Sequence, residues 1–454
     1  MSRLALFPND AGVTLLSDAG TLYRQPGFAL LDGDELRMGD AAFARARIDP
    51  RGVQHRYWSE LSLDPLVDRR FAHLSAADLV SRHLELIWQQ HGGADVVIAI
   101  PGGWSNDQVG LLLGIAQELQ MPVAALVDAA AAATRREYRQ ATPVHIDMGL
   151  HATTLTRMGQ SGQAQVEQTE VLENCGIYEL YDTWLKFVAE AFVQQSRFDP
   201  LHTAETEQAL LVQLGASISS ATERELLSFE LAHGGLSHRA EVESIALVNA
   251  VASYYQQIAS RLRALHRAGE TPALQVTDRV ARLPGLVLQL QARVGGQIFA
   301  LESGATARGA LARLADVSAG SERLSLKRQL AWDQSPFEVA EEVSAEVHAG
   351  TPTHLLFGST AYALADGPLS IGSQPQSDGR RIVLGQEMPG VSRLHCRLSI
   401  DDGRLIVDDS SRYGTFLNGH RISGSTVLQV GDTLRIGSPG YEMQLITTDE
   451  SHGA

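Results

Sequence analysis

Cysteine and long apolar runs are scarce in this sequence. Of its 454 residues only two are cysteine, Cys175 and Cys396, and they lie far apart. Two distant thiols do not make a disulfide framework, and they fit a reducing compartment. No run reaches about 18 apolar residues, the length that crosses a membrane. The opening residues, MSRLALFPND, lack the apolar core and cleavage site of a signal peptide. We therefore expect a cytoplasmic protein.

Positive charge is also in short supply. The sequence has 37 lysine and arginine residues against 53 aspartate and glutamate residues, a formal net charge of -16. Nucleic acids and anionic membranes are bound through basic surfaces. The charge therefore argues against nucleic acid and membrane partners, and we expect the partner to be a protein.

Several common catalytic and metal-binding motifs are absent. The sequence contains no CxxC, HExxH, GxSxG or GxxxxGK[ST] pattern. These patterns are typical of zinc or redox sites, metalloproteases, serine hydrolases and P-loop NTPases. We therefore predict no metal site. With 454 residues, the chain is long enough for two or three domains and at least one large core.

The first part of the chain alternates strands with helices. Asp95–Ile100 is a nearly continuous apolar run, which is typical of a strand buried on both faces. Ser105 and Gln108 then have the spacing of a capping box at the start of a helix. Pro122–Val127 is a second buried strand, and Pro143–Asp147 begins a third. This alternation predicts an α/β layer architecture.

Five segments, in order and spacing, resemble the actin-like (ribonuclease H-like) ATPase superfamily, in particular the nucleotide-binding domain of the large heat-shock chaperones. They are Phe28–Arg47, Val96–Ile115, Leu126–Thr134, His145–Leu155 and Ala273–Leu311. The resemblance implies a two-lobed α/β fold over residues 1–317, with Tyr178–Phe192 and Val242–Leu265 as helices of the second lobe. The peptide-binding domain and helical lid of the chaperones have no counterpart after residue 315, so chaperone activity is not implied.

In that family, glycine-bearing turns bind the phosphates of Mg-ATP, because a Cβ would obstruct their N–H donors. The first turn should read Asp-x-Gly-Thr-Thr, but residues 7–11 read FPNDA. Pro8 removes an N–H donor, and Asp10 brings a negative charge that repels phosphate. In the second turn Asp147 and Gly149 remain, while leucine and histidine replace the next glycines. The adenosine turn has Thr277 and Asp278 in place of its Gly-Gly pair.

Two interpretations of this N-terminal domain stay open. By the resemblance, Asp128 corresponds to the glutamate that positions the catalytic water, but no lysine for the γ-phosphate is identifiable. In the first interpretation the domain is a pseudo-ATPase that requires no cofactor and has no catalytic residues. In the second it is a switch that binds ATP or ADP with Mg through Asp128, Asp147 and Gly149 and hydrolyses ATP slowly, with Asp128 and Asp147 as the residual catalytic candidates. The lost donors and the added anion favour the first.

The last part of the chain has the pattern of antiparallel hairpins. Residues 396–407 alternate around the Asp401–Gly403 turn, and an Asn-Gly pair follows at Asn418–Gly419. With Ser392 and His395 as Ser-x-x-His, this segment resembles the forkhead-associated (FHA) domain. The resemblance implies an all-β sandwich over residues 353–448, preceded by a linker (318–352) and followed by a tail (449–454). Its loops would bind phosphothreonine in a protein partner.

A phosphothreonine pocket needs a guanidinium, a hydroxyl and backbone N–H groups that converge on the dianion. By the resemblance, Ser392 supplies the hydroxyl and Arg393 a neighbouring cation. The arginine of the family's Gly-Arg pair is here Ser373, and the asparagine of its Asn-Gly-Thr motif is Tyr413. The predicted phosphopeptide-binding residues are Ser373, Arg380, Arg381, Ser392, Arg393, Arg412, Tyr413 and Asn418, of which Arg380 or Arg381 is offered as the replacement cation.

The missing arginine leaves two interpretations of this module. A lost guanidinium forfeits about 1.5–3 kcal/mol of charge-assisted hydrogen bonding, which lowers affinity roughly ten- to a hundredfold. The module either retains phosphate-dependent binding or binds a protein, or its own N-terminal domain, without phosphate. Taken together, the sequence predicts a regulatory or scaffold protein.

Overall fold

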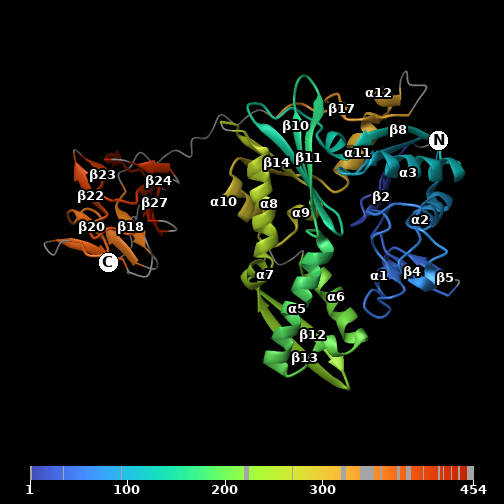
Figure 1. Ribbon diagram of the computed structural model, residues 1–454, viewed down its shortest axis with the longest axis horizontal. Coiled ribbons are helices and arrows are strands. Elements are labelled where there is room, and N and C mark those ends of the chain that lie inside the picture. Colours follow the sequence, from blue (N-terminus) through green and yellow to red (C-terminus); the bar gives the residue numbers. More distant parts are fainter. Residues whose placement is uncertain are drawn as a thin grey trace. The chain divides into compact units, whose positions relative to one another are not determined.

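The computed structural model describes residues 3–33, 35–93, 95–218, 224–267, 269–318, 324–337, 352–357, 360–375, 379–384, 390–401, 403–417, 420–422, 424–430, 432–437 and 440–446. The chain divides into two compact units, residues 1–339 and 340–454 (Figure 1). We call them the N-terminal unit and the C-terminal unit and describe each by itself.

The N-terminal unit is mixed α/β and contains two six-stranded sheets. The first has the order β16-β8-β7-β1-β2-β3. Strand β1 is antiparallel to β2 and parallel to β7, and β7 is parallel to β8. The bounds are β1 Leu4–Phe7, β2 Val13–Ser17, β3 Gly20–Gln25, β7 Val96–Ile100, β8 Val123–Asp128 and β16 Leu326–Lys327.

Five strands of the second sheet repeat the topology of β1, β2, β3, β7 and β8, whereas the sixth strands, β16 and β17, lie at opposite edges. Its order is β15-β14-β9-β10-β11-β17. Three successive antiparallel strands, β9 to β11, are joined on the other side of β9 by the parallel strands β14 and β15. The bounds are β9 Thr142–Met148, β10 Ala152–Gly159, β11 Ala164–Glu173, β14 Pro272–Val276, β15 Gln297–Ala300 and β17 Gln329–Leu330.

In chain order, each sheet carries an insertion between its third and fourth strands, that is, between β3 and β7 in the first sheet and between β11 and β14 in the second. The first contains β4 Ala29–Asp32, β5 Glu35–Met38, α1 Asp40–Phe43, β6 Val53–Gln54, η1 Arg69–Phe71 and α2 Ala76–His91. The second contains α5 Ile177–Ser196, η2 Pro200–His202, α6 Ala204–Ile218, β12 Leu226–His233, β13 Leu236–Glu243, α7 Ser244–Ala250 and α8 Ala252–Leu265. The remaining helices are α3 Asn106–Glu118, α4 Ala129–Ala133, α9 Asp278–Ala281, α10 Leu286–Val294, α11 Ala305–Ala312 and α12 Leu314–Ser318.

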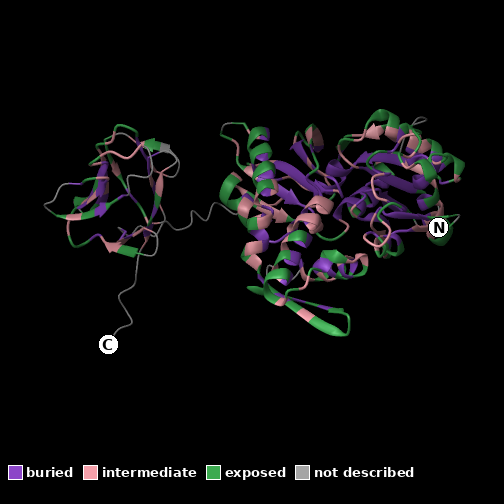
Figure 2. Cartoon of the chain, turned by 60° about the horizontal axis from the view of Figure 1, so that its bottom comes forward, coloured by how far each residue is buried: buried purple, intermediate pink, exposed green. Residues whose placement is uncertain are grey.

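Local sequence signals explain several of these elements. Every residue of β7 is buried, as its apolar run predicted, and most of the strands inside the N-terminal unit are coloured as buried in Figure 2. Ser105 and Gln108 form the predicted capping box at the start of α3, with bonds of 3.2 and 2.9 Å. The predicted helix Val242–Leu265 begins later, because Val242 and Glu243 end β13 and pair with β12.

Residues 326–330, which the sequence analysis placed in the linker, belong to the N-terminal unit. Leu326–Lys327 pairs with β8 of the first sheet, and Gln329–Leu330 pairs with β11 of the second. Arg135 forms a 2.7 Å ion pair with Asp333 just beyond them. The polar composition of this segment hid a short stretch that adds one strand to each sheet.

In its described residues, the C-terminal unit is all β and contains two facing sheets around an apolar core. One has the order β19-β18-β28-β27-β24-β25 and the other β21-β20-β22-β23-β26. The bounds of the first are β18 His354–Phe357, β19 Thr360–Ala363, β24 Thr415–Leu417, β25 His420–Ile422, β27 Thr433–Ile436 and β28 Tyr441–Ile446. Those of the second are β20 Leu369–Gly372, β21 Arg380–Val383, β22 Cys396–Asp401, β23 Arg404–Asp409 and β26 Ser425–Val427. In the described residues of either unit, no helix is both long and apolar enough to span a membrane.

Candidate functional site

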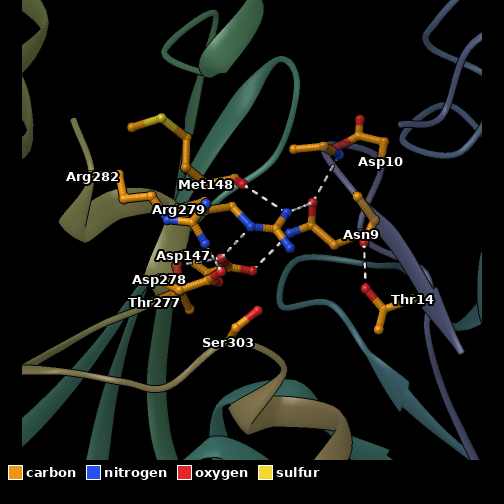
Figure 3. Close-up of polar contacts among 12 residues, drawn as sticks. Asn9, Asp10, Thr14, Asp147, Met148, Thr277, Asp278, Arg279, Arg282 and Ser303 are labelled. Atoms are coloured by element: carbon orange, nitrogen blue, oxygen red, sulfur yellow. Dashed lines mark hydrogen bonds and ion pairs between the residues drawn. The ribbon is translucent and has the colours of Figure 1, made fainter. Parts of the chain in front are cut away.

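Three turns of the N-terminal unit meet between its two sheets (Figure 3). We call them the first turn (residues 8–12, between β1 and β2), the second turn (149–151, between β9 and β10) and the third turn (277–279, after β14). They contain the positions at which the sequence analysis compared this chain with nucleotide-binding turns. The contacts among their side chains therefore decide what the cleft can accept.

Asp147, at the end of β9, is bonded by side chains of the other two turns. Its Oδ2 accepts a 2.7 Å hydrogen bond from Asn9 Nδ2, and its Oδ1 accepts a 2.8 Å bond from Thr277 Oγ1. Arg279 Nε lies 3.8 Å from the same Oδ1. Both carboxylate oxygens thus already have partners within the chain.

Arg279 is the cation of this cluster. Its Nη1 donates to Asn9 Oδ1 and, at 3.4 Å, to the carbonyl oxygen of Met148, and its side chain is 11% exposed. Figure 3 shows the guanidinium between Asn9 and Asp147. Arg279 comes from the third turn, so it ties the first and third turns to the end of β9. The sequence analysis missed this residue.

Asp10 fills the second turn. Its Oδ1 accepts a 2.7 Å hydrogen bond from the backbone N–H of Leu150. A Cβ at Gly149 would come within 2.6 Å of the same oxygen, so this glycine gives room to Asp10. Burial raises the pKa of Asp10, while the Leu150 N–H and nearby Arg279 act to lower it. The N–H that a phosphate would use is occupied by a carboxylate of the chain.

Asp128 caps a helix. Its Oδ1 accepts bonds from the N–H groups of Ala130 (2.9 Å) and Ala131 (3.2 Å) at the start of α4. The side chain is buried, and burial raises its pKa. The described residues that line the neighbouring cavity include Ala129 and Ala130 but not Asp128. Asp147 and Gly149 line this cavity, whereas the Asp128 carboxylate is bonded to the start of α4.

This cavity has a volume of about 200 Å³ and lies beside the three turns. Pockets for drug-sized ligands begin at about 300 Å³. One of its lining residues is His145, whose Nε2 has no hydrogen-bond partner in the described part of the chain. Burial lowers the pKa of His145, so the ring stays neutral. The cavity is thus smaller than a pocket for a drug-sized ligand.

Two hydrogen-bonded histidines, His151 and His55, join the second turn to the insertion of the first sheet. His151 Nδ1 lies 2.7 Å from Glu179 Oε1, and His151 Nε2 lies 2.8 Å from His55 Nδ1. His55 also stacks on Tyr178, with ring centroids 4.5 Å apart. Burial lowers the pKa of His55 to about 4. His151, which stands where the family has glycine, is therefore part of a second contact across the cleft.

In the C-terminal unit, a buried histidine joins the loop that contains Ser392 to the loop that contains Gly414. His395 Nδ1 accepts a 3.1 Å bond from the Ser392 N–H, and its Nε2 donates to the Gly414 carbonyl at 3.2 Å. Ser392 Oγ accepts a 3.1 Å bond from the Arg412 N–H. The histidine thus organises the loops, and Ser392 and Arg412 lie together.

Ser373 and Arg393 belong to the same group of loops. The Ser373 N–H donates to the Ser392 carbonyl at 3.0 Å, and the Gln374 N–H donates to the Arg393 carbonyl at 2.9 Å. Any Cβ at Gly372 would collide with the Arg393 carbonyl, so a glycine is needed at this close approach. The Arg393 side chain is exposed.

The other predicted residues lie elsewhere. Arg380 pairs with Leu369, at the opposite end of β20 from Gly372, a separation of about 10 Å at the rise of a strand. Its Nη1 bonds the Gly367 carbonyl at 3.4 Å. Arg381 is opposite Ser370. Tyr413, in the Arg412 loop, is 59% exposed, and Asn418 lies outside the described residues. Arg380 is therefore not brought to Ser392.

Residues 369–437 match the family model of the FHA domain. This segment is an FHA domain. The match covers the strands from β20 to β27 and both loops around Ser392 and Gly414, and it confirms the resemblance seen in the sequence. It does not extend to the N-terminal unit. No curated protein matches the chain.

Proposed function

We propose that this protein is a regulatory scaffold whose FHA domain binds a threonine-phosphorylated segment of a protein partner. In the same proposal, the N-terminal unit is an actin-like domain that has lost ATP hydrolysis and presents a second protein surface. FHA domains bind phosphopeptides, so the first half of the proposal follows directly from the family match.

The observation that carries the proposal is the group of loops around Ser392. The hydroxyl of Ser392, the backbone of Arg412 and the exposed side chain of Arg393 belong to two loops that His395 holds together. Hydroxyl, N–H and guanidinium groups are the donors that phosphate recognition uses. Because the loops are fixed by buried contacts, they are organised before a ligand arrives.

The repeated topology supports the actin-like assignment. Both sheets add two parallel strands beside three antiparallel ones, and each has its insertion at the same place. The two-lobed fold inferred from the sequence has this kind of internal duplication. The three turns that the resemblance assigned to phosphates and adenosine also meet in one cleft.

The contents of that cleft support the loss of ATPase activity. The residues do not fit Mg-ATP, because Asp10 occupies the Leu150 N–H and the space beside Gly149. The guanidinium of Arg279 lies against Asp147, one of the residues that the switch interpretation assigns to nucleotide binding. To enter, a nucleotide would have to displace the buried carboxylate of Asp10 and the buried guanidinium of Arg279. Both groups already bond the residues that would contact its phosphates.

An array of threonine-phosphorylated peptides, each beside its unphosphorylated form, tests the proposal on the full-length protein. We expect binding only to phosphorylated members. Equal binding to both forms would leave a protein-binding module without phosphate dependence, and binding to neither would remove the proposed partner class altogether.

A further inference from the structure

The FHA domain lacks the guanidinium that its family places after Gly372, where this chain has Ser373. Arg380 and Arg381 do not supply it, because β21 runs parallel to β20 and places them at the Leu369 end. A phosphate pocket at Ser392 therefore needs a cation from another strand, if the proposed function holds.

Arg421 lies in a strand that can place a cation beside the Gly414 loop. It lies in the middle of β25 and pairs with Phe416 of β24, the strand that continues from the Gly414 loop. Residues directly opposite in an antiparallel pair point to the same face of the sheet, and so do residues two apart in a strand. By this register Arg421 and Gly414 belong to one face.

The side chain of Arg421 reaches back to Gly414. A Cβ built at Gly414 would lie 2.7 Å from Arg421 Nε and 3.2 Å from its Cζ. Gly414 has a φ of +98°, which disfavours other residues independently of this contact. The glycine thus leaves the guanidinium lying on the loop whose Arg412 N–H is bonded to Ser392 Oγ.

The donors of Arg421 are free for a ligand. Arg421 is exposed and has no hydrogen bond or ion pair with the residues that the structure describes. Arg435, on the other side of Phe416, differs in this respect. Its Nη1 donates to the Gly437 carbonyl at 3.1 Å, and its guanidinium lies 4.1 Å from the Phe416 ring centroid. Of these two neighbouring arginines, Arg421 is the one whose guanidinium N–H groups make no hydrogen bond with the described residues.

We infer that Arg421 supplies the guanidinium of the phosphothreonine pocket, in place of the arginine missing at Ser373. This inference rests on the proposed function and deepens it. The phosphate then lies between Ser392 on one loop and Arg421 over Gly414 on the other. Guanidinium binds two phosphate oxygens at once, whereas lysine acts as a point charge, so arginine is specifically required.

The test uses the full-length protein and the tightest phosphothreonine peptide from the array, with binding followed by fluorescence anisotropy. Arg421→Gln keeps the length of the side chain and removes its charge, and we expect about a 10- to 100-fold loss of affinity. Arg421→Lys should lose less than Arg421→Gln but not recover the wild-type value. Arg404→Gln is the matched control, because Arg404 is an exposed arginine at the far hairpin end of β23.

A rescue variant makes the assignment specific. Adding Ser373→Arg to the Arg421→Gln protein restores a guanidinium at the family's position, and we expect most of the lost affinity to return. Circular dichroism melts of each variant verify that the sandwich remains folded.

The outcomes separate the inference from the proposed function. If the wild-type protein binds no phosphothreonine peptide, the proposed function fails and the inference fails with it. If the wild type binds and Arg421→Gln binds as tightly as Arg404→Gln, the pocket stands and the role of Arg421 is wrong. A loss confined to the Arg421 variants, with rescue by Ser373→Arg, supports both.

Discussion

The two units differ in what their polar loops are bonded to. In the cleft of the N-terminal unit, Asp10, Asp147 and Arg279 are buried or nearly so, and they bond groups of the chain itself. In the FHA domain, Arg393 and Arg421 are exposed and have no ion pair among the described residues. The same kinds of donors and acceptors therefore hold one unit together and stay open for a ligand in the other.

The difference teaches how a ligand cleft can become a structural contact. A carboxylate in the second turn and a guanidinium between the turns take the places of an anion and a cation. Once such groups are buried, they are held by low-dielectric electrostatics, and removing either leaves the other uncompensated. On the proposed function, the cleft contributes to the stability of the unit instead of binding nucleotide.

The largest effect is expected for Arg279→Ala. Removing one partner of a buried ion pair leaves Asp147 without its cation, and we expect the free energy of unfolding of the N-terminal unit to fall by about 3 kcal/mol. Urea denaturation measures this change. Arg282→Ala is the control, because Arg282 directly follows α9, the helix that contains Arg279, its side chain is half exposed, and its pair with Asp278 is worth about 1 kcal/mol or less. Equal losses in the two variants would remove the structural role of Arg279.

The next effect concerns the open loops. Ser392→Ala combined with Arg393→Ala removes a hydroxyl acceptor for the Arg412 N–H and one exposed cation. We expect phosphopeptide affinity to fall by about a hundredfold or more, with the thermal melting of the domain nearly unchanged. Anisotropy titration measures the first and circular dichroism the second. Unchanged affinity in this double variant would contradict the placement of the pocket.

Asp10→Ala should have a smaller effect on stability. It leaves the buried Leu150 N–H without its acceptor, a cost of about 1–3 kcal/mol. Urea denaturation at neutral pH measures it, with Asp18→Ala, an exposed position, as the control. A variant as stable as wild type would show that water replaces the carboxylate at no cost, and that the second turn is open after all.

The smallest effect is a pH dependence from the hydrogen-bonded pair of His55 and His151. The pKa of His55 is lowered from 6.5 to about 4 by burial, so the unfolded chain binds a proton that the folded one does not between these values. Stability contributed by neutral His55 is thus complete above pH 6.5 and is lost as pH falls toward 4, by at most about 1.4 kcal/mol per pH unit.

His55→Gln measures that contribution. His83 has its pKa lowered to about 4 in the same way, so the variant should reduce the pH slope and not abolish it. Urea midpoints at about pH 7 and about pH 5 give the slope for both proteins. If the slopes are equal, His55 is not the group that titrates in this window.

Local patterns in the sequence predicted much of the fold. The apolar run before Pro101, the capping box of α3 and the alternation from Cys396 onward each depend on neighbouring residues, and each appears in the structure. The loops of the FHA domain could be placed because Ser392 and His395 form the short Ser-x-x-His pattern of that family. By contrast, β16 and β17 contain two residues each and lie in a polar segment, where no periodic pattern can develop.

The contacts that decide the cleft could not be predicted from the sequence. Arg279 and Asn9 are 270 positions apart, and nothing in their spacing indicates that one bonds the other. Arg421 is a different case. The Asn-Gly pair at 418–419 of the sequence predicts a two-residue hairpin turn, and such a turn pairs Phe416 with Arg421, so the observed strand register was available from the sequence. What was missing was the side-chain direction over Gly414.

Calorimetric titration of the full-length protein with Mg-ATP tests the comparison most directly. A cleft held by Asp10 and Arg279 should give heats equal to those of dilution, while the same preparation still binds its phosphothreonine peptide. Binding of Mg-ATP in the micromolar range or tighter would contradict the account, and the N-terminal unit would then be a nucleotide-dependent switch.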